Sequence, residues 1–388
     1  MMNKSWWRSK NELDDDQKAF IQLPAQGRYS LIGPPGSGKT NLLLLRAQFI
    51  AGTGEKNVLI ITYTKALADF IRTGIGATGL ISPDQVRTYH SWAFSHILEN
   101  LGQRALPRET DFDDSARDEV VRLVREANSK LPSKKLFSAI FVDEAQDLSA
   151  DELDALLCLS DKVAICGDEH QGIYRRNGLS IIDKLKLQPH SLKRHFRIGQ
   201  RIARVADRLI PPERQEDSLE AMSNYDLKSQ GESSANLYSC ETRDEQFILM
   251  LEKIKIQLDA FKDEGIGIFC GKRESLEDLR SRFNDTDLAE QVCVHGIDED
   301  ASFSGKYMIH VLTMHAAKGT EFRAVHLFGI EELARYPLNR SRLAYTAITR
   351  AKTALNAFRT GSTSNGIENA FAEPRHMELD DLFPGDKT

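Results

Sequence analysis

Short apolar runs alternate along this chain with longer segments whose apolar residues recur at helical spacing. The apolar runs of the first half are nearly continuous, which is typical of parallel strands buried on both faces. They cover residues 28–32, 57–63, 137–142 and 162–166. Helical patterns lie between them, for example at 39–49, 66–71 and 150–159. This alternation predicts a parallel sheet with helices on both sides, an α/β fold.

The same alternation starts again after a polar segment at 211–234, which we interpret as a surface excursion. The strands predicted there are 265–270, 308–312 and 324–328, and the helices are 276–283 and 343–351. We therefore expect two α/β lobes, residues 1–197 and 198–388, the first with a small helical insertion at about 95–136. The acidic segment 377–388 has the composition of a frayed end.

Composition narrows the class of protein. With 388 residues, 41% of them hydrophobic and 28% charged, the chain can form two full cores and resembles an ordinary globular protein. Its net charge of −6 argues against a wholly basic nucleic-acid coat protein but is compatible with a local basic groove. The longest apolar runs are strand-sized and segment 1–12 lacks an apolar stretch, so we expect no membrane span, no signal peptide and a cytoplasmic protein.

The cysteines are scattered, and no two of them form a Cys-x-x-Cys pair. They are Cys158, Cys166, Cys240, Cys270 and Cys293. This spacing predicts no disulfide framework, no zinc site and no iron–sulfur cluster, and it fits a reducing compartment.

A glycine-rich segment links the first predicted strand to the first predicted helix and matches the pattern G-x-x-x-x-G-K-[ST]. Backbone N–H groups of such a loop surround a β-phosphate, and Lys39 brings a positive charge to the β- and γ-phosphate oxygens. Thr40 offers a hydroxyl to Mg²⁺. The predicted phosphate-binding residues are Gly33, Pro34, Pro35, Gly36, Ser37, Gly38, Lys39 and Thr40. The segment therefore predicts ATP and Mg²⁺ as ligands.

Two carboxylates follow the predicted strand 137–142. A parallel strand delivers the residues after it to the edge of the sheet where ligands bind. Asp143 is expected to hold Mg²⁺ through water, and Glu144 to orient and deprotonate the water that attacks the γ-phosphate. The carboxylates and the glycine-rich loop together predict an ATP-hydrolysing site.

Taken in order, these and later motifs resemble those of the UvrD/Rep/PcrA-type superfamily 1 helicases. The matching segments are 143–147 (DEAQD), 167–174 (GDEHQGIY), 192–197 (LKRHFR), 313–322 (TMHAAKGTEF) and 342–352 (RLAYTAITRAK). The resemblance implies two RecA-like P-loop NTPase lobes with parallel sheets. Because Gln146 stands where 5′→3′ enzymes more often have Ser, it also favours the 3′→5′ branch.

The resemblance assigns roles to residues around the γ-phosphate. It implies that Gln171 couples the phosphate to the nucleic-acid site and that Arg197 contacts the phosphate. Arg350 takes the position of an arginine finger from the second lobe, so the charge of the transition state is neutralised only when the lobes close. Further nucleotide contacts are implied at Gln17 and Phe196, which would read and stack on adenine, and at Glu321.

A strand-binding surface is implied by the same resemblance. Tyr63 is expected to stack on a base and Lys65 to meet a phosphate, although Tyr63 as a plain core aromatic stays open. His90 as a satisfied buried histidine is likewise open. The chain departs from the family at Lys65, which replaces Asn, and at Arg176, which replaces an aromatic residue. The full set of expected contacts is Tyr63, Lys65, Thr88, His90, Tyr174, Arg176, Thr313, His315 and Lys318.

These motifs predict an ATP-dependent translocase or helicase that acts on single-stranded DNA, with RNA left open. The alternative is a nucleic-acid-gated ATPase switch that acts with a partner nuclease or effector without processive motion. A P-loop kinase or GTPase leaves Arg350 and 313–322 unexplained, and no N-K-x-D guanine-binding motif is visible. Since the insertion at 95–136 is smaller than an independent domain, we expect unwinding to need a protein partner or self-assembly.

Overall fold

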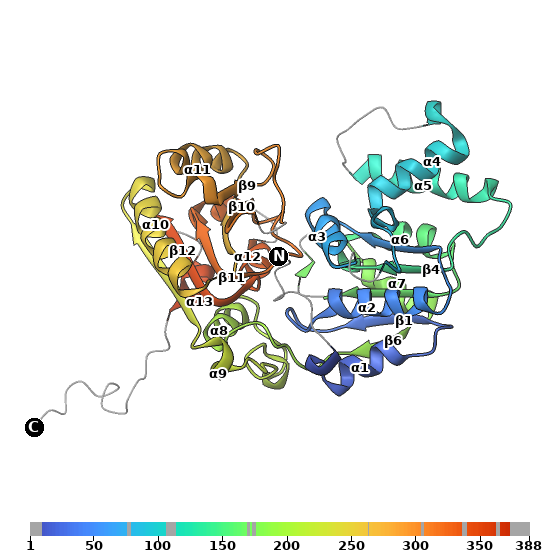
Figure 1. Cartoon of the computed structure of the whole chain (residues 1–388), viewed down its shortest axis with the longest axis horizontal. Helices are drawn as coiled ribbons and strands as arrows, with labels where there is room; N and C mark the ends of the chain where they lie inside the picture. The colour runs from blue at the N-terminus through green and yellow to red at the C-terminus, as the bar shows by residue number, and fades with distance from the viewer. Residues whose placement is uncertain are drawn as a thin grey trace, which may run out of the picture.

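The chain folds into two α/β lobes that lie side by side, each built on a six-stranded sheet (Figure 1). This computed structural model describes residues 10–75, 79–105, 114–168, 171–172, 176–262, 264–303, 306–335, 340–361 and 365–372. Within the part of the chain so described, every strand pairing inside the two sheets is parallel. The predicted fold class, two RecA-like lobes with parallel sheets, is confirmed.

The first sheet has the strand order β3-β2-β4-β5-β1-β6. Its strands are β1 (Arg28–Ile32), β2 (Val58–Thr62), β3 (Val86–Thr88), β4 (Ala139–Val142), β5 (Val163–Gly167) and β6 (Gln188–Ser191). The helices of this lobe are α1 (Asp15–Gln22), α2 (Lys39–Gly52), α3 (Lys65–Ile75), α4 (Tyr89–Leu101), α5 (Asp114–Lys130), α6 (Ala150–Leu157) and α7 (Ile181–Leu185). Helices α4 and α5 pack on each other at the top right of Figure 1.

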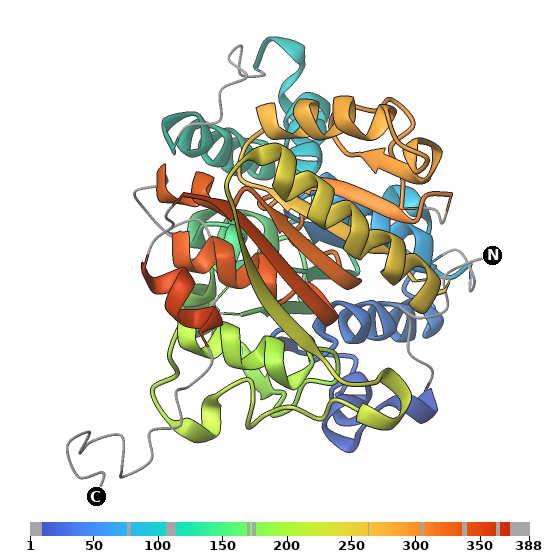
Figure 2. The same cartoon turned by 90° about the vertical axis from the view of Figure 1, so that its left-hand side faces the viewer.

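The second sheet has the strand order β7-β12-β11-β8-β10-β9. Its strands are β7 (Ser234–Cys240), β8 (Ile266–Cys270), β9 (Val292–Val294), β10 (Ile309–Thr313), β11 (Phe322–Phe328) and β12 (Ala351–Thr360). The helices are α8 (Gln200–Leu209), α9 (Leu227–Gln230), α10 (Arg243–Ala260), α11 (Glu274–Asn284), α12 (Arg340–Ile348) and α13 (Asn365–Phe371). Helix α10 lies across the outer face of this sheet (Figure 2).

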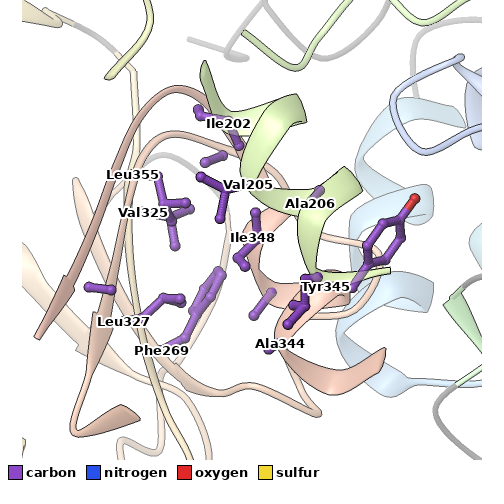
Figure 3. Packing of buried hydrophobic residues seen from close by; sticks show 14 of the residues in the cluster. Ile202, Val205, Ala206, Phe269, Val325, Leu327, Ala344, Tyr345, Ile348 and Leu355 are labelled. Atoms are coloured by element: carbon purple, nitrogen blue, oxygen red, sulfur yellow. The ribbon is translucent and has the colours of Figure 1, made fainter. Parts of the chain in front are cut away.

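Apolar packing on both faces of each sheet explains why the strands read as continuous hydrophobic runs. In β2, β4, β5 and β8 every residue is buried. One face of the second sheet packs against α8 and α12, where Val205 and Ile348 meet Val325 and Leu355 (Figure 3). Burial of this kind contributes roughly 25 cal/mol per Å² of apolar surface, so packing against both sheets is a main source of stability.

Several elements differ from the sequence prediction. Strands β6 and β12 were not expected, because β6 is a largely exposed polar edge strand and β12 begins at Ala351, where a helix was predicted to end. The segment 211–234 is not simply a surface excursion, since Leu219 and Tyr225 are buried in it. Among the described residues, no helix combines the length and apolar character needed to cross a membrane.

Candidate functional site

The glycine-rich loop joins β1 to α2, as its pattern predicts. Gly36 and Gly38 adopt φ angles of +77° and +87°, a region that residues with a Cβ rarely occupy. A Cβ on Gly36 would also lie 3.0 Å from Cβ of Arg197. Lys39 Nζ donates hydrogen bonds to the carbonyl oxygens of Gly33 (2.8 Å) and Pro34 (3.0 Å). The loop therefore presents backbone N–H groups at a helix N-terminus with an ammonium group held above them.

Asp143 follows β4 directly and is buried beside the loop. Its Oδ1 accepts hydrogen bonds from the Cys166 thiol (2.8 Å) and the Glu144 N–H (2.9 Å), whereas no described residue donates one to its Oδ2. Burial and the neighbouring Glu144 carboxylate raise its pKa, and the side chain of Thr40 counteracts this. A buried carboxylate oxygen beside a threonine hydroxyl fits a Mg²⁺ ion, which prefers oxygen ligands.

Glu144 has a strained backbone with φ of +54°, which is uncommon outside glycine and is seen at active sites. The Gln146 amide donates a hydrogen bond to its carboxylate. Burial alone would raise the pKa of Glu144, but the charges of Lys318, Arg350 and Lys39 outweigh burial and lower it. The carboxylate is therefore ionised and can accept a proton.

A cavity of about 620 Å³ lies where the lobes meet, a volume typical of small-ligand sites. Its lining includes Pro35, Gly36, Gly38, Lys39, Thr40, Glu144 and Gln171 from the first lobe and Glu321, Arg350 and Lys352 from the second. Arg350, only 4% exposed, crosses between the lobes and its Nη2 donates a 2.6 Å hydrogen bond to Gln171 Oε1. Burial, with help from Arg197, lowers the pKa of Arg350 to about 10, so the guanidinium stays charged at pH 7. The two lobes thus bring opposite parts of one site together.

Arg197 and Phe196 lie on the same wall of the cavity. Arg197 Nη1 pairs with Glu321 Oε2 at 2.6 Å, and Lys352 Nζ pairs with the other Glu321 oxygen at 3.2 Å. Burial would raise the pKa of Glu321, but Lys352 and Arg197 lower it to about 2. Glu321 therefore positions two cations that face the cavity. Lys352 was not among the predicted site residues.

Gln17 differs from its expected role. Its amide nitrogen donates to the Ser37 carbonyl (2.9 Å) and its amide oxygen accepts from the Asp14 N–H (3.1 Å). Both ends of the amide are thus used inside the protein, where they fasten α1 to the phosphate loop rather than face the cavity. Polar side chains that sequence patterns did not single out line the cavity instead. They are Asn224, Asp226, Gln230 and Arg323.

Lys318 is also placed differently from its prediction as a strand contact. It is 1% exposed, and its Nζ lies 2.7 Å from Asp147 Oδ2 and 3.6 Å from Glu144 Oε2. It also donates to the Gln171 carbonyl at 2.8 Å. An ammonium group enclosed by the other lobe's carboxylates cannot touch a nucleic acid in this conformation, so Lys318 fastens the lobes together.

Three of the expected strand contacts gather at one place on the first lobe. Tyr63 packs at the edge of the core, with the His90 ring 6.0 Å away. The Arg176 guanidinium lies 5.4 Å from the Tyr63 ring centroid, and its Nη1 donates to the Tyr63 hydroxyl (3.1 Å) and to the Asp147 carbonyl (2.7 Å). Burial, then Arg117 and Arg176, lowers the pKa of His90 to about 4. The Tyr63 ring is thus covered by the Arg176 guanidinium.

The other expected strand contacts lie on several different elements of the two lobes. Thr88 caps α4 by accepting from the Ser91 N–H at 3.2 Å. Thr313 accepts from the Ala316 N–H at 3.2 Å, and Lys65 is exposed. His315 is half-buried, and burial lowers its pKa. Tyr174 lies outside the described residues.

Comparisons with known proteins support the same assignment. Residues 308–357 match the model of a UvrD-like helicase C-terminal domain, and residues 16–177 match that of an AAA domain. Over 82 residues the chain is 42% identical to "ATP-dependent DNA helicase PcrA" of Bacillus subtilis (strain 168), which covers 18% of this chain and 11% of that protein. The matched part is therefore a small fraction of that relative.

A solved structure named "The structure of PRRSV helicase" aligns with a TM-score of 0.41 and 17% identity, over 89% of this chain and 54% of that one. The two domain matches fall on the two lobes that form the cavity. The match at 16–177 contains the phosphate loop, and the match at 308–357 contains Arg350. The chain is therefore similar to UvrD-like helicases in its second lobe and to an AAA domain in its first.

Proposed function

We propose that this protein is an ATP-dependent motor that moves 3′→5′ along single-stranded DNA and hydrolyses ATP between its two lobes, residues 1–197 and 198–388. The observation that carries the proposal is the 2.6 Å contact of Arg350 with Gln171 across the cavity. An arginine from one lobe that lines the same cavity as the phosphate loop of the other makes hydrolysis depend on lobe closure. Closure that alternates with opening can drive steps along a strand.

The chemistry follows from the groups around the cavity. Lys39 and the N–H groups of the loop would bind the β- and γ-phosphates, while Thr40 and Asp143 would hold Mg²⁺. When bound, the ion neutralises charge on the phosphate oxygens. Glu144, ionised and fixed by Gln146, orients the attacking water and accepts its proton.

Charge that develops on the γ-phosphate is met by Arg350 and Arg197, which line the same cavity as Lys39. Both guanidinium groups already point into the cavity and are held by protein acceptors, which lowers the reorganisation needed during reaction. Phe196, at the same wall, offers a ring for the base of the nucleotide.

Single-stranded DNA is proposed as the track because the family and the named relative act on DNA, with RNA as the alternative polymer. Tyr63, His90 and Arg176 form a ring-and-cation group of the kind that stacks with bases. Gln171 of the first lobe is bound to the second lobe at two points. Its backbone carbonyl accepts a hydrogen bond from Lys318, and its side chain accepts one from Arg350.

The proposal is tested by steady-state ATPase assays with single-stranded DNA, duplex DNA and single-stranded RNA, with Lys39→Ala as the inactive control. We expect a low basal rate that rises steeply with single-stranded DNA. Direction is tested by displacement of streptavidin from biotin at either end of a strand, and a 3′→5′ motor clears the 5′ end. An ATPase that no nucleic acid stimulates would refute the proposal.

The proposed motor should translocate better than it unwinds. Among the described residues, the insertion at about 95–136 consists mainly of the end of α4 and of α5, and the interval between β8 and β10 contains α11 and β9. Few described residues outside the two lobes are therefore available to contact a duplex. A fluorescent duplex with a 3′ tail tests this beside the streptavidin assay. Efficient unwinding of about 20 base pairs by the monomer would contradict the expectation. ATPase activity without displacement or unwinding would instead favour the gated switch acting with a partner.

A further inference from the structure

Three potential metal ligands meet on the second sheet, outside the nucleotide cavity. Strands β9 and β10 are parallel, and their register places His310 opposite Cys293. Because side chains alternate along a strand, His295, two residues after Cys293, lies on the same face of the sheet as Cys293. The His295 N–H extends this ladder by donating to the Val311 carbonyl at 3.0 Å. Sheet geometry therefore gathers a thiol and two imidazoles.

The distances between the ligand atoms suit a single ion. Cys293 Sγ lies 3.7 Å from His295 Nε2, and His295 Nε2 lies 3.0 Å from His310 Nδ1. All three ligand atoms are within 4.8 Å of one another. In a tetrahedral zinc site with Zn–S of about 2.3 Å and Zn–N of about 2.05 Å, sulfur and nitrogen are about 3.5 Å apart and two nitrogens about 3.3 Å apart. The Cys293–His295 and His295–His310 separations differ from these values by only a few tenths of an ångström.

The surroundings orient the ligands and favour a cation. The Phe303 ring stacks on both imidazoles, with centroids 4.2 Å from His295 and 5.0 Å from His310. The backbone of Tyr307 hydrogen-bonds His310, which fixes the ring as partners of metal-bound histidines do. The Asp298 carboxylate accepts from the Val294 N–H at 2.8 Å, so a negative charge lies beside the strand that carries Cys293.

We propose that Cys293, His295 and His310 form a binding site for one late first-row transition-metal ion, with Zn²⁺ as the ion that fits the ligands and their spacing. A thiolate and two imidazoles select such ions over Mg²⁺ and Ca²⁺, which prefer oxygen. Three protein ligands leave a fourth position, which water fills. On binding, the Cys293 S–H bond breaks, the S–Zn bond forms, and the proton passes to the solvent.

Cysteine spacing alone predicts no zinc site, because the cysteines are unpaired along the sequence. The site instead depends on strand pairing, which brings together Cys293 in β9, His295 directly after β9, and His310 in β10. A bound ion would cross-link the edge strand β9 to β10 and thereby hold the segment between them. Strand β10 ends at Thr313, one of the residues expected to contact the nucleic acid, so the ion would also stiffen its support.

The test uses the full chain, stripped with a chelator, dialysed and kept free of nucleotide, with excess Mg²⁺ to occupy oxygen sites. Co²⁺ is titrated in as a spectroscopic substitute and then displaced by Zn²⁺. We expect one equivalent of Co²⁺ to give a thiolate-to-metal charge-transfer band with tetrahedral visible bands, and equimolar Zn²⁺ to abolish them. Zn²⁺ should also raise the melting temperature of the chain.

Three variants make the result specific. Cys293→Ser should lose the charge-transfer band, and His295→Asn, at the half-buried ligand, should weaken Zn²⁺ affinity by about tenfold or more. Cys158→Ser, which removes an exposed thiol elsewhere, should change neither. Absence of the band, its persistence in Cys293→Ser, or its loss in Cys158→Ser would overturn the proposal. If Cys293→Ser does not fold, unchanged Zn²⁺ affinity of His295→Asn overturns it equally.

Discussion

Replacement of Arg350 by alanine tests the two-lobe site most directly. The guanidinium is buried, charged at pH 7 and 2.6 Å from Gln171, so the variant removes a positive charge from a region shielded from water. Arginine fingers contribute a factor of about 10³ to 10⁵ in kcat. We therefore expect kcat to fall on the order of 10³-fold or more, which corresponds to about 4 kcal/mol of transition-state stabilisation.

The assay is steady-state ATP hydrolysis at saturating single-stranded DNA, with binding of a fluorescent ATP analogue measured separately. Binding should survive in Arg350→Ala, because Lys39 and the phosphate loop are unchanged. Arg342→Ala is the matched control. Arg342 lies on α12, the helix that ends two residues before Arg350. Its Nη1 donates to the Gly172 carbonyl of the first lobe at 3.3 Å, but it is not among the residues that line the cavity. We expect this control to keep kcat within a few-fold of the natural chain.

Two results would refute the reasoning. Normal hydrolysis by Arg350→Ala would show that its charge does not act on the phosphate. An equal loss in Arg342→Ala would show that contact between the lobes, rather than charge at the γ-phosphate, limits the rate.

Further predictions concern the base, the strand and stability. Glu144→Gln should still bind ATP and Mg²⁺ but lose turnover in a single-turnover assay, and near-normal turnover would exclude Glu144 as the base. Tyr63→Ala should weaken binding of a labelled strand by roughly 1–3 kcal/mol while Tyr63→Phe keeps it, and unchanged affinity in Tyr63→Ala would return the ring to a core role. Strand affinity should also fall steeply as salt rises in the same titration, and insensitivity would argue against phosphate contacts. Burial lowers the pKa of His326 to about 3 in the folded chain. Below about pH 6.5 this histidine takes up a proton in the unfolded chain but not in the folded one, so the free energy of unfolding falls as the pH falls. At pH 5 this effect costs about 2 kcal/mol of unfolding free energy. Urea unfolding should show that the free energy lost between pH 7 and pH 5 is smaller by that amount in His326→Gln than in the natural chain, and equal losses in the two proteins would contradict the prediction.

The buried parts of the fold could be predicted because buried positions require apolar residues, which are visible in the sequence. Strands covered on both faces must be apolar throughout, so β2, β4 and β8 could be found from their residues. Strand β6 could not, since three of its four residues are exposed and only its backbone pairing with β1 makes it a strand. Helix α10 was missed for a related reason, because its apolar residues, two of them exposed isoleucines, do not form a single face.

At the site, sequence predicts which residues carry charge but not which charges meet. Asp147 is fully buried, and its partner Lys318 comes from the other lobe, so neither residue alone reveals the pair. Gln17 has the amide that adenine recognition needs, yet the capping of α1 and the Ser37 carbonyl already use it. Pairings that depend on tertiary structure, including the register that joins Cys293 to His310, leave no local signal.

The attachment of Arg350 has a mechanical consequence. Helix α12 ends at Ile348 and β12 begins at Ala351, so the arginine stands in a two-residue junction just before an interior strand of the sheet. Its carbonyl accepts from the Phe322 N–H at 3.0 Å and its Nε donates to the Thr346 carbonyl at 3.0 Å. The arginine has no flexible tether and can approach a phosphate only when the whole second sheet moves with it. Each hydrolysis event therefore requires one closure of the lobes. For the same reason, a load that pulls the lobes apart slows the chemical step itself.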